Sequence, residues 1–322
     1  MENYYIGLDI GGTKILGALF DSRGNLLKID KKATKAPKGS EKTLEQLNKV
    51  IIALIEDKND LLKGIGIGVP GIIKDGEILF TPNMPWSNFN LKETLSDIYK
   101  VPVLVGNDAN VSLLGEWLHG KAKGYNYVAG YFVGTGIGGA LILDGKLYEG
   151  AMGAAGEIGH MNVNPDGVFC GCGSRGCLES FSSKTGMLKE IKNQISRGRK
   201  TYLSQFMENS NNYILKSSHL KEAVENEDAL VMEVIEDMCK YLGVSVASII
   251  NLINPEIVIM GGGIMESLGE ILLPRIKKHT DRYVLKDSIK NCSIELSTLK
   301  DEACLWGAYG LLEENLIVES ED

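Results

Sequence analysis

The sequence lacks a hydrophobic run long enough to cross a bilayer, and it has no surplus of positive charge. No apolar stretch approaches the ~20 residues that a transmembrane helix needs. The 34 lysines and arginines are outnumbered by 42 aspartates and glutamates, so the formal net charge is -8. Nucleic acids and anionic membranes repel an acidic chain, and we expect neither as a partner. Any phosphate must then be bound locally, by backbone N–H groups, a metal ion and a few lysines.

The six cysteines do not form a disulfide framework. Cys170, Cys172 and Cys177 lie close together, and the other three are scattered in apolar surroundings. No leader-like segment with a charged start and an apolar core precedes the first strand pattern. These features are typical of a reduced, cytoplasmic protein.

The pattern of strands and helices indicates an α/β protein with two domains. A chain of 322 residues is long enough to bury two cores. A strand from Tyr4 to Ile10, a glycine turn and two further strands to about Ala33 form an opening meander. The same plan recurs from Tyr127 to Tyr148, with Asp144-Gly145 as a hairpin turn. The recurrence suggests an internal duplication, in which two facing lobes would place the glycine turns on opposite sides of one cleft.

Apolar residues at helical spacing predict the main helices. The expected helices are Ser40–Asp57, Leu91–Tyr99, Lys184–Arg197, Glu222–Ile253, Leu268–Lys278 and Ala303–Glu313.

Two glycine turns could wrap a polyphosphate. Asp9 precedes the first turn, Gly11-Gly12-Thr13-Lys14, and could hold Mg²⁺ through water. The first turn could equally be an ordinary glycine hairpin, and it is not a standard P-loop because no helix follows it. The second turn, Gly134-Thr135-Gly136, is weak evidence alone. Two such turns in matching positions favour a shared polyphosphate ligand.

Asp108 has two possible roles. A strand over Val101–Val105 closes on Gly106-Asn107-Asp108, and an apolar-patterned helix follows at once. Asp108 could cap that helix, which is the commoner role for such a residue. It could also act as a general base that accepts the proton of an alcohol attacking phosphorus, with Asn107 orienting the same substrate. The sequence does not choose between these roles, because one carboxylate can serve both.

A compact set of soft ligands lies between Glu157 and Glu179. Cysteine and histidine in a Cys3His set are typical of structural zinc sites, which leave no position open for water. Its members are His160, Cys170, Cys172 and Cys177, and glycines at 171, 173 and 176 would let the backbone turn tightly between them. The alternatives are a chance cluster of buried cysteines and a catalytic zinc, and four protein ligands argue against the catalytic zinc.

Near the end of the chain, Gly261, Gly262 and Gly263 follow a strand. They would allow close approach of adenine or ribose, or they form a tight strand-to-helix turn.

Together these motifs resemble the ROK family (repressors, open reading frames and sugar kinases), and within it the bacterial ATP-dependent glucokinases. The motifs occur in family order from Asp9 to Gly263, so the resemblance covers nearly the whole chain. They are Asp9 to Lys14, Thr81-Pro82-Asn83 with Trp86, Gly106 to Asn110, Gly134 to Gly139, Gly156 to His160, the three cysteines with Glu179, and Gly261 to Gly263.

The resemblance implies an actin-like, hexokinase-type fold of two ribonuclease-H-like lobes. The small lobe would comprise residues 1–118 with a C-terminal helix over 304–316, and residues 119–303 would form a large lobe with the zinc knuckle. The implied reaction is ATP-dependent phosphorylation of glucose at its 6-hydroxyl, with Asp108 as the base. The family is often dimeric or tetrameric.

The resemblance also implies the ligands of each site. The sugar would contact Gly71, Asn83, Asn107, Asp108, Glu157, His160 and Glu179, with His160 serving zinc through one ring nitrogen and sugar through the other. ATP and Mg²⁺ would contact Asp9, Gly11, Gly12, Thr13, Lys14, Gly134, Thr135 and Gly136, and Gly261, Gly262 and Gly263 would lie near adenosine.

Several alternatives stay open. Mannose, fructose or an N-acetylated amino sugar could replace glucose, although the Glu157–His160 motif and the Asn83–Trp86 loop favour glucose. Polyphosphate as donor is disfavoured because no basic groove is evident. A sugar-sensing ROK repressor would carry an added N-terminal helix-turn-helix, and a first strand near residue 4 leaves no room for one.

Overall fold

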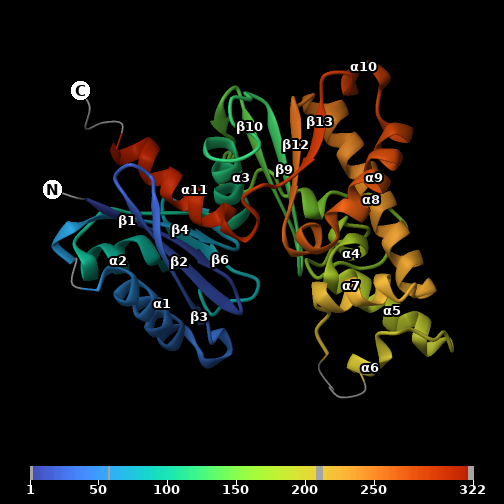
Figure 1. Cartoon of the computed structure of the whole chain (residues 1–322), viewed down its shortest axis with the longest axis horizontal. Helices are drawn as coiled ribbons and strands as arrows, with labels where there is room; N and C mark the ends of the chain where they lie inside the picture. Colours follow the sequence, from blue (N-terminus) through green and yellow to red (C-terminus); the bar gives the residue numbers. More distant parts are fainter. Residues whose placement is uncertain (1–2, 57–58, 208–212, 318–322) are drawn as a thin grey trace. The chain divides into compact units, whose positions relative to one another are not determined.

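The computed structural model describes residues 3–56, 59–207 and 213–317 (Figure 1). Contacts divide the chain into two compact units. The first unit comprises Met1–Gly124, Lys146–Ala155 and Asp301–Asp322, and the second comprises Tyr125–Gly145 and Gly156–Lys300. No helix within the described ranges combines the length and the apolar character that a membrane span requires.

The first sheet has the order β3-β2-β1-β4-β8. Its strands are β1 (Tyr4–Ile10), β2 (Lys14–Asp21), β3 (Leu26–Ala33), β4 (Leu62–Val69) and β8 (Val103–Asn107). The pairs β1–β2 and β2–β3 are antiparallel, whereas β1–β4 and β4–β8 are parallel. The three antiparallel strands form the predicted opening meander.

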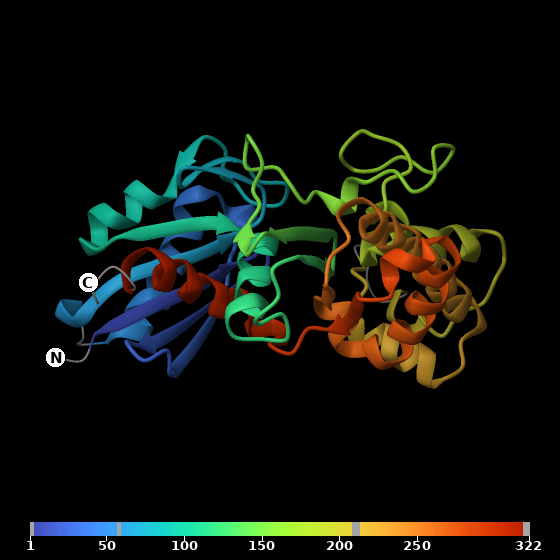
Figure 2. The same ribbon diagram turned by 90° about the horizontal axis from the view of Figure 1, so that it is seen from above.

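Both faces of the first sheet are covered by helices, because its inner strands carry apolar residues on both sides. Ile6, Leu8 and Ile10 of β1 belong to one buried cluster with α1 (Ser40–Ile55) and α2 (Leu91–Tyr99). Tyr5 of β1 packs on the opposite face with α11 (Ala303–Leu312), which also contacts α3 (Asp108–Leu118). Figure 2 shows α11 lying across the strands of this sheet. Helix α11, near the end of the chain, thus packs on the first strand.

A small sheet follows β4 in the chain. It contains β5 (Ile72–Lys74), β6 (Glu77–Phe80) and β7 (Phe89–Asn90). Asp75-Gly76, a dipeptide typical of hairpin turns, joins β5 and β6 with positive φ angles of 53° and 84°. Residues 81–88 contain no helix or strand.

The second sheet repeats the plan of the first, with the order β11-β10-β9-β12-β13. Its strands are β9 (Val128–Val133), β10 (Ile137–Leu143), β11 (Lys146–Leu147), β12 (Ile257–Gly261) and β13 (Ser293–Leu296). The pair β9–β10 is antiparallel, and β9–β12 and β12–β13 are parallel, like β1–β2, β1–β4 and β4–β8. This correspondence agrees with the suggested duplication.

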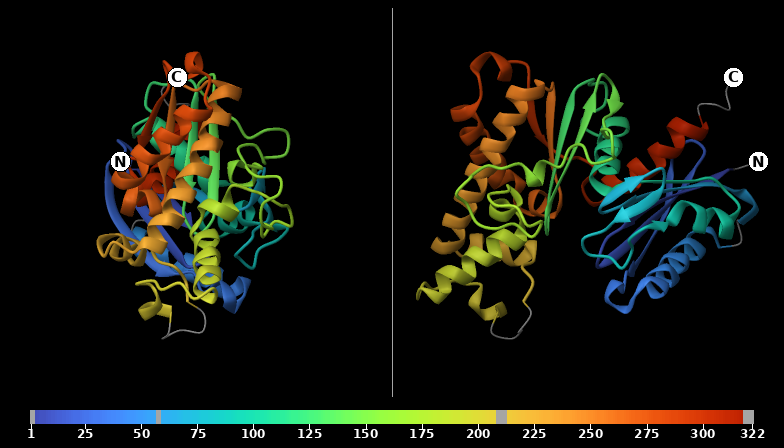
Figure 3. Two further views of the ribbon diagram at one scale, coloured as in Figure 1. Left: turned by 90° about the vertical axis from the view of Figure 1, so that its right-hand side faces the viewer. Right: turned by 180° about the vertical axis from the view of Figure 1, so that it is seen from behind.

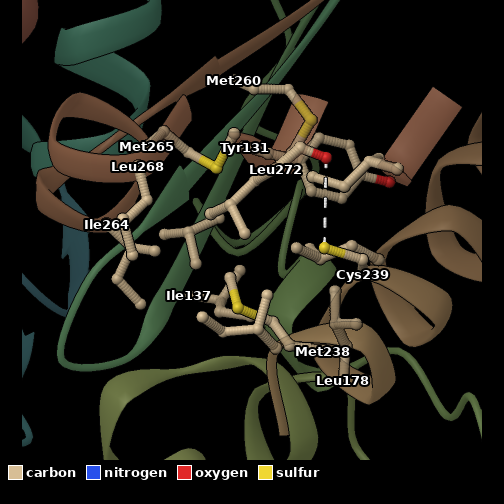
Figure 4. Packing of buried hydrophobic residues seen from close by; sticks show 14 of the residues in the cluster. Tyr131, Ile137, Leu178, Met238, Cys239, Met260, Ile264, Met265, Leu268 and Leu272 are labelled. Atoms are coloured by element: carbon tan, nitrogen blue, oxygen red, sulfur yellow. Dashed lines mark hydrogen bonds between the residues drawn. The ribbon is translucent and has the colours of Figure 1, made fainter. Parts of the chain in front are cut away.

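Helices of the second unit enclose its core. They are α4 (Glu179–Ser182), α5 (Lys184–Ser196), α6 (Ser204–Met207), α7 (Ser217–Glu225), α8 (Ala229–Ile253), α9 (Gly263–Tyr283) and α10 (Lys286–Ile289). The long helices α8 and α9 run side by side (Figures 1 and 3). Tyr131 of β9, Ile137 of β10 and Met238 of α8 lie in one buried cluster, shown in Figure 4.

Several predicted boundaries were wrong. The predicted helix Glu222–Ile253 is two helices, because the side chain of Asp228 caps α8 by accepting a hydrogen bond from the N–H of Val231. Helix α9 begins at Gly263, five residues before the predicted Leu268, since the glycine turn leads directly into it. Strand β8 starts at Val103 and not at Val101, because Pro102 has no N–H for the ladder. Asp57, the predicted end of α1, lies outside the described residues.

Candidate active site

Two carboxylates meet at one edge of the first sheet. Asp9 is the next-to-last residue of β1, and Asp108 is the first residue of α3, directly after β8. Strand β4 lies between them, and its Gly68 pairs with Asp9 on one side and with Gly106 on the other. A Cβ added to Gly68 would lie 2.2 Å from Sγ of Cys304, whereas the Cα of Asp108 at 3.5 Å would be in ordinary contact. Glycine at this position therefore leaves room for the Cys304 thiol beside the two strand ends.

The surroundings of Asp9 are strongly acidic. Burial raises the pKa of Asp9 to about 7, the charge of Asp108 adds to this shift, and the ammonium of Lys14 opposes it. Lys14 is also paired with Asp301, with 3.4 Å between Nζ and Oδ1. The Cys304 side chain forms a hydrogen bond with Asp9, and burial raises the pKa of this thiol, which keeps it neutral. Carboxylates that share one lysine suit a hard divalent cation such as Mg²⁺, which prefers oxygen ligands.

Asn107, and not Asp108, caps α3. Its Oδ1 accepts hydrogen bonds from the N–H groups of Ala109 at 2.9 Å and Asn110 at 3.1 Å. Its Nδ2 donates to the carbonyl oxygen of Gly71 over 3.0 Å. Oδ1 of Asp108 accepts a hydrogen bond from the adjacent N–H of Ala109 at 2.9 Å. The capping role considered for Asp108 thus belongs to its neighbour.

The structure brings Gly71 and Asn83 to the same part of the first unit. Gly71 has a φ of 115°, and a Cβ there would lie 2.0 Å from the carbonyl oxygen of Phe80, so only glycine fits. The hydroxyl of Thr81 donates to the carbonyl oxygens of Met84 and Trp86, which shapes the loop that carries Asn83. A Cβ on Gly12 would lie 3.1 Å from the carbonyl oxygen of Asn83. This loop therefore packs against the first glycine turn.

The first glycine turn presents two backbone donors. The N–H of Gly11 donates to the carbonyl oxygen of Lys14 at 2.8 Å, and Thr34 binds the carbonyl oxygens of Gly11 and Thr13. In the described part of the chain, the N–H groups of Gly12 and Thr13 have no protein acceptor. Thr13 is exposed, so an anion can reach these donors.

The second glycine turn, Gly134–Gly136, also presents two backbone N–H donors. The N–H of Gly134 donates to the carbonyl oxygen of Gly136 at 2.9 Å. The start of α5 holds two of the three carbonyl groups of the turn: Lys184 N donates to the carbonyl oxygen of Gly134, and Thr185 Oγ1 donates to that of Thr135. No protein acceptor for the N–H groups of Thr135 and Gly136 is found over the residues described here. Both predicted phosphate turns thus offer a pair of N–H donors.

Gly261, Gly262 and Gly263 form a tight strand-to-helix turn, which is one of the two structures that the sequence suggested for them. Gly261 ends β12, Gly262 has a φ of 85°, and Gly263 begins α9. A Cβ on Gly262 would lie 2.7 Å from the backbone of Val133, which is followed by the second glycine turn. The two glycine segments of the second unit are therefore neighbours.

Sequence reasoning missed four side chains near these turns. A Cβ on Gly263 would lie 3.9 Å from Nζ of Lys184 and 3.6 Å from Oγ of Ser217. Asp301 and Cys304 lie beside Lys14 and Asp9 in the first unit. None stands in a recognisable motif, and each is brought in by a helix that is distant in sequence, so no local signal could have identified them.

The predicted metal ligands come together. One ligand atom from each of His160, Cys170, Cys172 and Cys177 lies within 4.8 Å of all the others. The Sγ atoms of Cys172 and Cys177 are 3.8 Å apart, and Nδ1 of His160 lies 3.8 Å from Sγ of Cys170. Two thiolates on a tetrahedral zinc with bonds of about 2.3 Å are separated by about 3.8 Å. The donor set and its spacing therefore fit zinc.

The surrounding loop explains how the ligands are held and why a cation is needed. Gly173 and Gly176 have φ angles of 91° and 77°, whereas Gly171 needs no such conformation. A Cβ on Gly176 would lie 1.9 Å from the carbonyl oxygen of Asn164. Burial raises the pKa of Cys177 to about 12, so a bound cation is required to keep this residue a thiolate.

Glu157 and His160 are exposed on a short turn that packs on β10. Ile158, between them, is buried, and Gly159 lies so close to β10 that a Cβ would be 2.1 Å from the carbonyl oxygen of Ile137. Because Nδ1 of His160 faces Cys170, its Nε2 is the nitrogen left for another partner. Glu179 begins α4, and its Oε2 accepts a hydrogen bond from the N–H of Ile137 at 2.9 Å.

Comparisons with known proteins find the family that the motifs suggest. The model of the ROK family matches residues 5–315. A glucokinase of Halalkalibacterium halodurans is 32% identical over 320 residues, which is 97% of this chain and 96% of that protein. A xylose repressor of Caldicellulosiruptor bescii is 33% identical over 321 residues, which is 97% of this chain and 78% of the repressor.

A solved structure is similar over the same length. The ROK family glucokinase from Streptomyces griseus, in complex with glucose and AMPPNP, has a TM-score of 0.83 and 29% identity and covers 97% of this chain and 100% of its own. This likeness confirms the predicted actin-like sugar kinase fold, with two mixed five-stranded sheets.

Proposed function

The chain belongs to the ROK family, and we propose that it is a sugar kinase that transfers the γ-phosphoryl group of ATP to the 6-hydroxyl of glucose. The observation that carries the proposal is the position of Asp108, at the start of α3 and beside Asp9. Phosphoryl transfer needs a group to accept the alcohol proton, and electrostatic partners for the phosphates.

In this proposal the two glycine turns bind the phosphates of ATP. Each turn offers two N–H donors without a protein acceptor among the described residues, at Gly12 and Thr13 and at Thr135 and Gly136. Backbone donors in a glycine turn suit phosphate oxygens because no side chain obstructs them. Asp9 would hold Mg²⁺, which neutralises phosphate charge when bound. Gly261, Gly262 and Gly263, next to the second turn, would lie near the adenosine.

Asp108 would accept the proton of the sugar 6-hydroxyl as that oxygen attacks phosphorus. A positioned carboxylate is sufficient for this role, since the reaction depends mainly on orientation. Asn107 supports the geometry, because its side chain fixes both the start of α3 and Gly71. Asn107 therefore acts as a positioning residue as well as a proposed sugar contact.

The remaining sugar hydroxyls would be recognised by Asn83, Glu157, Glu179 and Nε2 of His160. Carboxylates and amides in fixed places discriminate sugars, because a wrong isomer leaves buried polar groups unpaired. His160, Cys170, Cys172 and Cys177 would hold zinc with all four positions filled, so the ion stabilises the loop and is not a catalyst.

Glucose is favoured as substrate because relatives over the full length are glucokinases. A coupled assay with ATP, Mg²⁺ and a panel of glucose, mannose, fructose and N-acetylated amino sugars tests the assignment. Turnover of another hexose without turnover of glucose would support the kinase activity but contradict glucose as the substrate.

A sugar-sensing repressor is the second candidate, because the xylose repressor is as similar in sequence as the glucokinase. The net charge of -8 argues against DNA binding by the chain itself. A sequence-specific, salt-dependent shift of operator DNA, with no turnover of any hexose, would favour the repressor.

A further inference from the structure

The carboxylate of Glu179 lies between the metal-binding cluster and the second glycine turn. Its Oε2 accepts a hydrogen bond from the N–H of Ile137 at 2.9 Å, one residue after the turn Gly134–Gly136. A Cβ on Gly136 would lie 2.3 Å from the same oxygen, so the turn approaches the carboxylate as closely as glycine allows. Its Oε1 lies 4.0 Å from Sγ of Cys170, a predicted zinc ligand.

Residues on either side hold this carboxylate in place. Leu178 precedes Glu179 and follows the ligand Cys177, and its side chain is fully buried. Ile137, whose N–H binds Glu179, is buried in the same cluster (Figure 4). Both backbones are therefore anchored in one core, and the hydrogen bond joins two segments separated by 42 positions in sequence.

The turn is fixed from two sides. Lys184 and Thr185 at the start of α5 bind the carbonyl groups of Gly134 and Thr135. Glu179 binds the N–H that follows the turn. These contacts orient the peptide groups whose N–H donors, at Thr135 and Gly136, have no protein acceptor in the described segments. Loss of Glu179 would release one side of this arrangement.

We propose that Glu179 is a positioning residue that connects the cluster of His160, Cys170, Cys172 and Cys177 to the Gly134–Gly136 turn. Metal in the cluster then sets the affinity of the turn for the nucleotide, in addition to supporting the sugar contacts. The inference rests on the proposed role of this turn in binding ATP phosphates.

Calorimetry with a non-hydrolysable ATP analogue and Mg²⁺, without sugar, tests the connection in the zinc-loaded protein. We expect Glu179→Ala to weaken binding about tenfold, since a hydrogen bond to a charged group is lost. Glu179→Gln keeps an acceptor for the N–H of Ile137 and should bind within about twofold of the wild type. Glu190→Ala, which removes an exposed carboxylate of the same charge from α5, should leave the nucleotide affinity unchanged.

Removal of zinc with a chelator is the second test of this connection. Chelation should weaken nucleotide binding by the wild type by a similar factor, and it should add little to the loss already present in Glu179→Ala. Hydrogen exchange at the Ile137 amide should be slow in the zinc-loaded wild type and faster after either change.

Unchanged exchange at Ile137 and unchanged nucleotide affinity in Glu179→Ala would overturn the positioning role. Equal losses in the Gln and Ala variants would also overturn it, because a charge effect and not a hydrogen bond would then explain them. Failure of the wild type to bind the analogue would instead contradict the proposed kinase function, and the exchange at Ile137 would still decide whether Glu179 holds the turn.

Discussion

The side-chain amide of Asn107 donates a hydrogen bond to the carbonyl oxygen of Gly71 over 3.0 Å, while its oxygen caps α3. One residue thus fixes both the helix that begins with Asp108 and Gly71, which follows β4. The proposed base therefore begins a helix whose first turn is anchored to its surroundings.

Replacing Asn107 by alanine should lower both stability and activity. Loss of the cap and of the bond to Gly71 should cost about 1–2 kcal/mol in the free energy of unfolding. Asn90→Ala is the matched control, because Asn90 caps α2 by accepting the N–H of Glu93 at 2.9 Å, away from the proposed base. Urea unfolding and kcat/KM should show similar stability losses in the two variants but reduced catalysis in Asn107→Ala alone. Equal catalysis in both would contradict the positioning role.

Asp9 should make the metal-free protein less stable as the pH rises. Its pKa is raised from 3.8 to about 7, so the folded state favours the protonated form. The stabilisation is complete below about pH 4 and is lost as the pH rises through about 7, and it amounts to about 4 kcal/mol at most. Unfolding measured from pH 4 to 8 with chelator should show this loss in the wild type and not in Asp9→Asn. Identical pH dependence in both proteins would exclude Asp9 as the cause.

Removing one proposed metal ligand should remove the metal. Cys172→Ala leaves three ligands, so we expect zinc to be absent by elemental analysis and glucose to bind more weakly, because the loop with Glu157 and His160 loosens. Cys292→Ala, a cysteine outside the cluster, should retain the metal. A wild-type protein purified without zinc would count against the metal site.

Two glycines of the same loop should respond differently to alanine. Gly176→Ala places a Cβ 1.9 Å from the carbonyl oxygen of Asn164 at a φ of 77°, and we expect a loss of about 1–3 kcal/mol. Gly171→Ala meets no atom within 4 Å and should be nearly neutral. Thermal unfolding of the zinc-loaded variants checks this difference, and equal effects would refute the described loop geometry.

Local patterns predicted much of the fold. Short apolar segments separated by turns identified the meander Tyr4–Ala33, and Asp144-Gly145 identified a hairpin turn, because these signals depend on neighbours in sequence. The break before α8 was missed because the side chain of Asp228 competes with an apolar pattern that continues across it.

The metal cluster was predictable for a similar reason, since its ligands are close in sequence. The contact between Glu179 and Ile137, and those of Asp301 and Cys304 near Asp9, were not predictable. They depend on which segments the fold brings together, and no spacing in the sequence records this.

The most direct test of the central claim is a kinase assay with ATP, Mg²⁺ and the hexose panel, on the wild type and Asp108→Asn. We predict that glucose is phosphorylated at its 6-hydroxyl and that kcat falls ~10²–10⁴-fold in the variant while glucose still binds. No phosphorylation of any hexose by the wild type, or near-normal turnover by Asp108→Asn, would contradict the account.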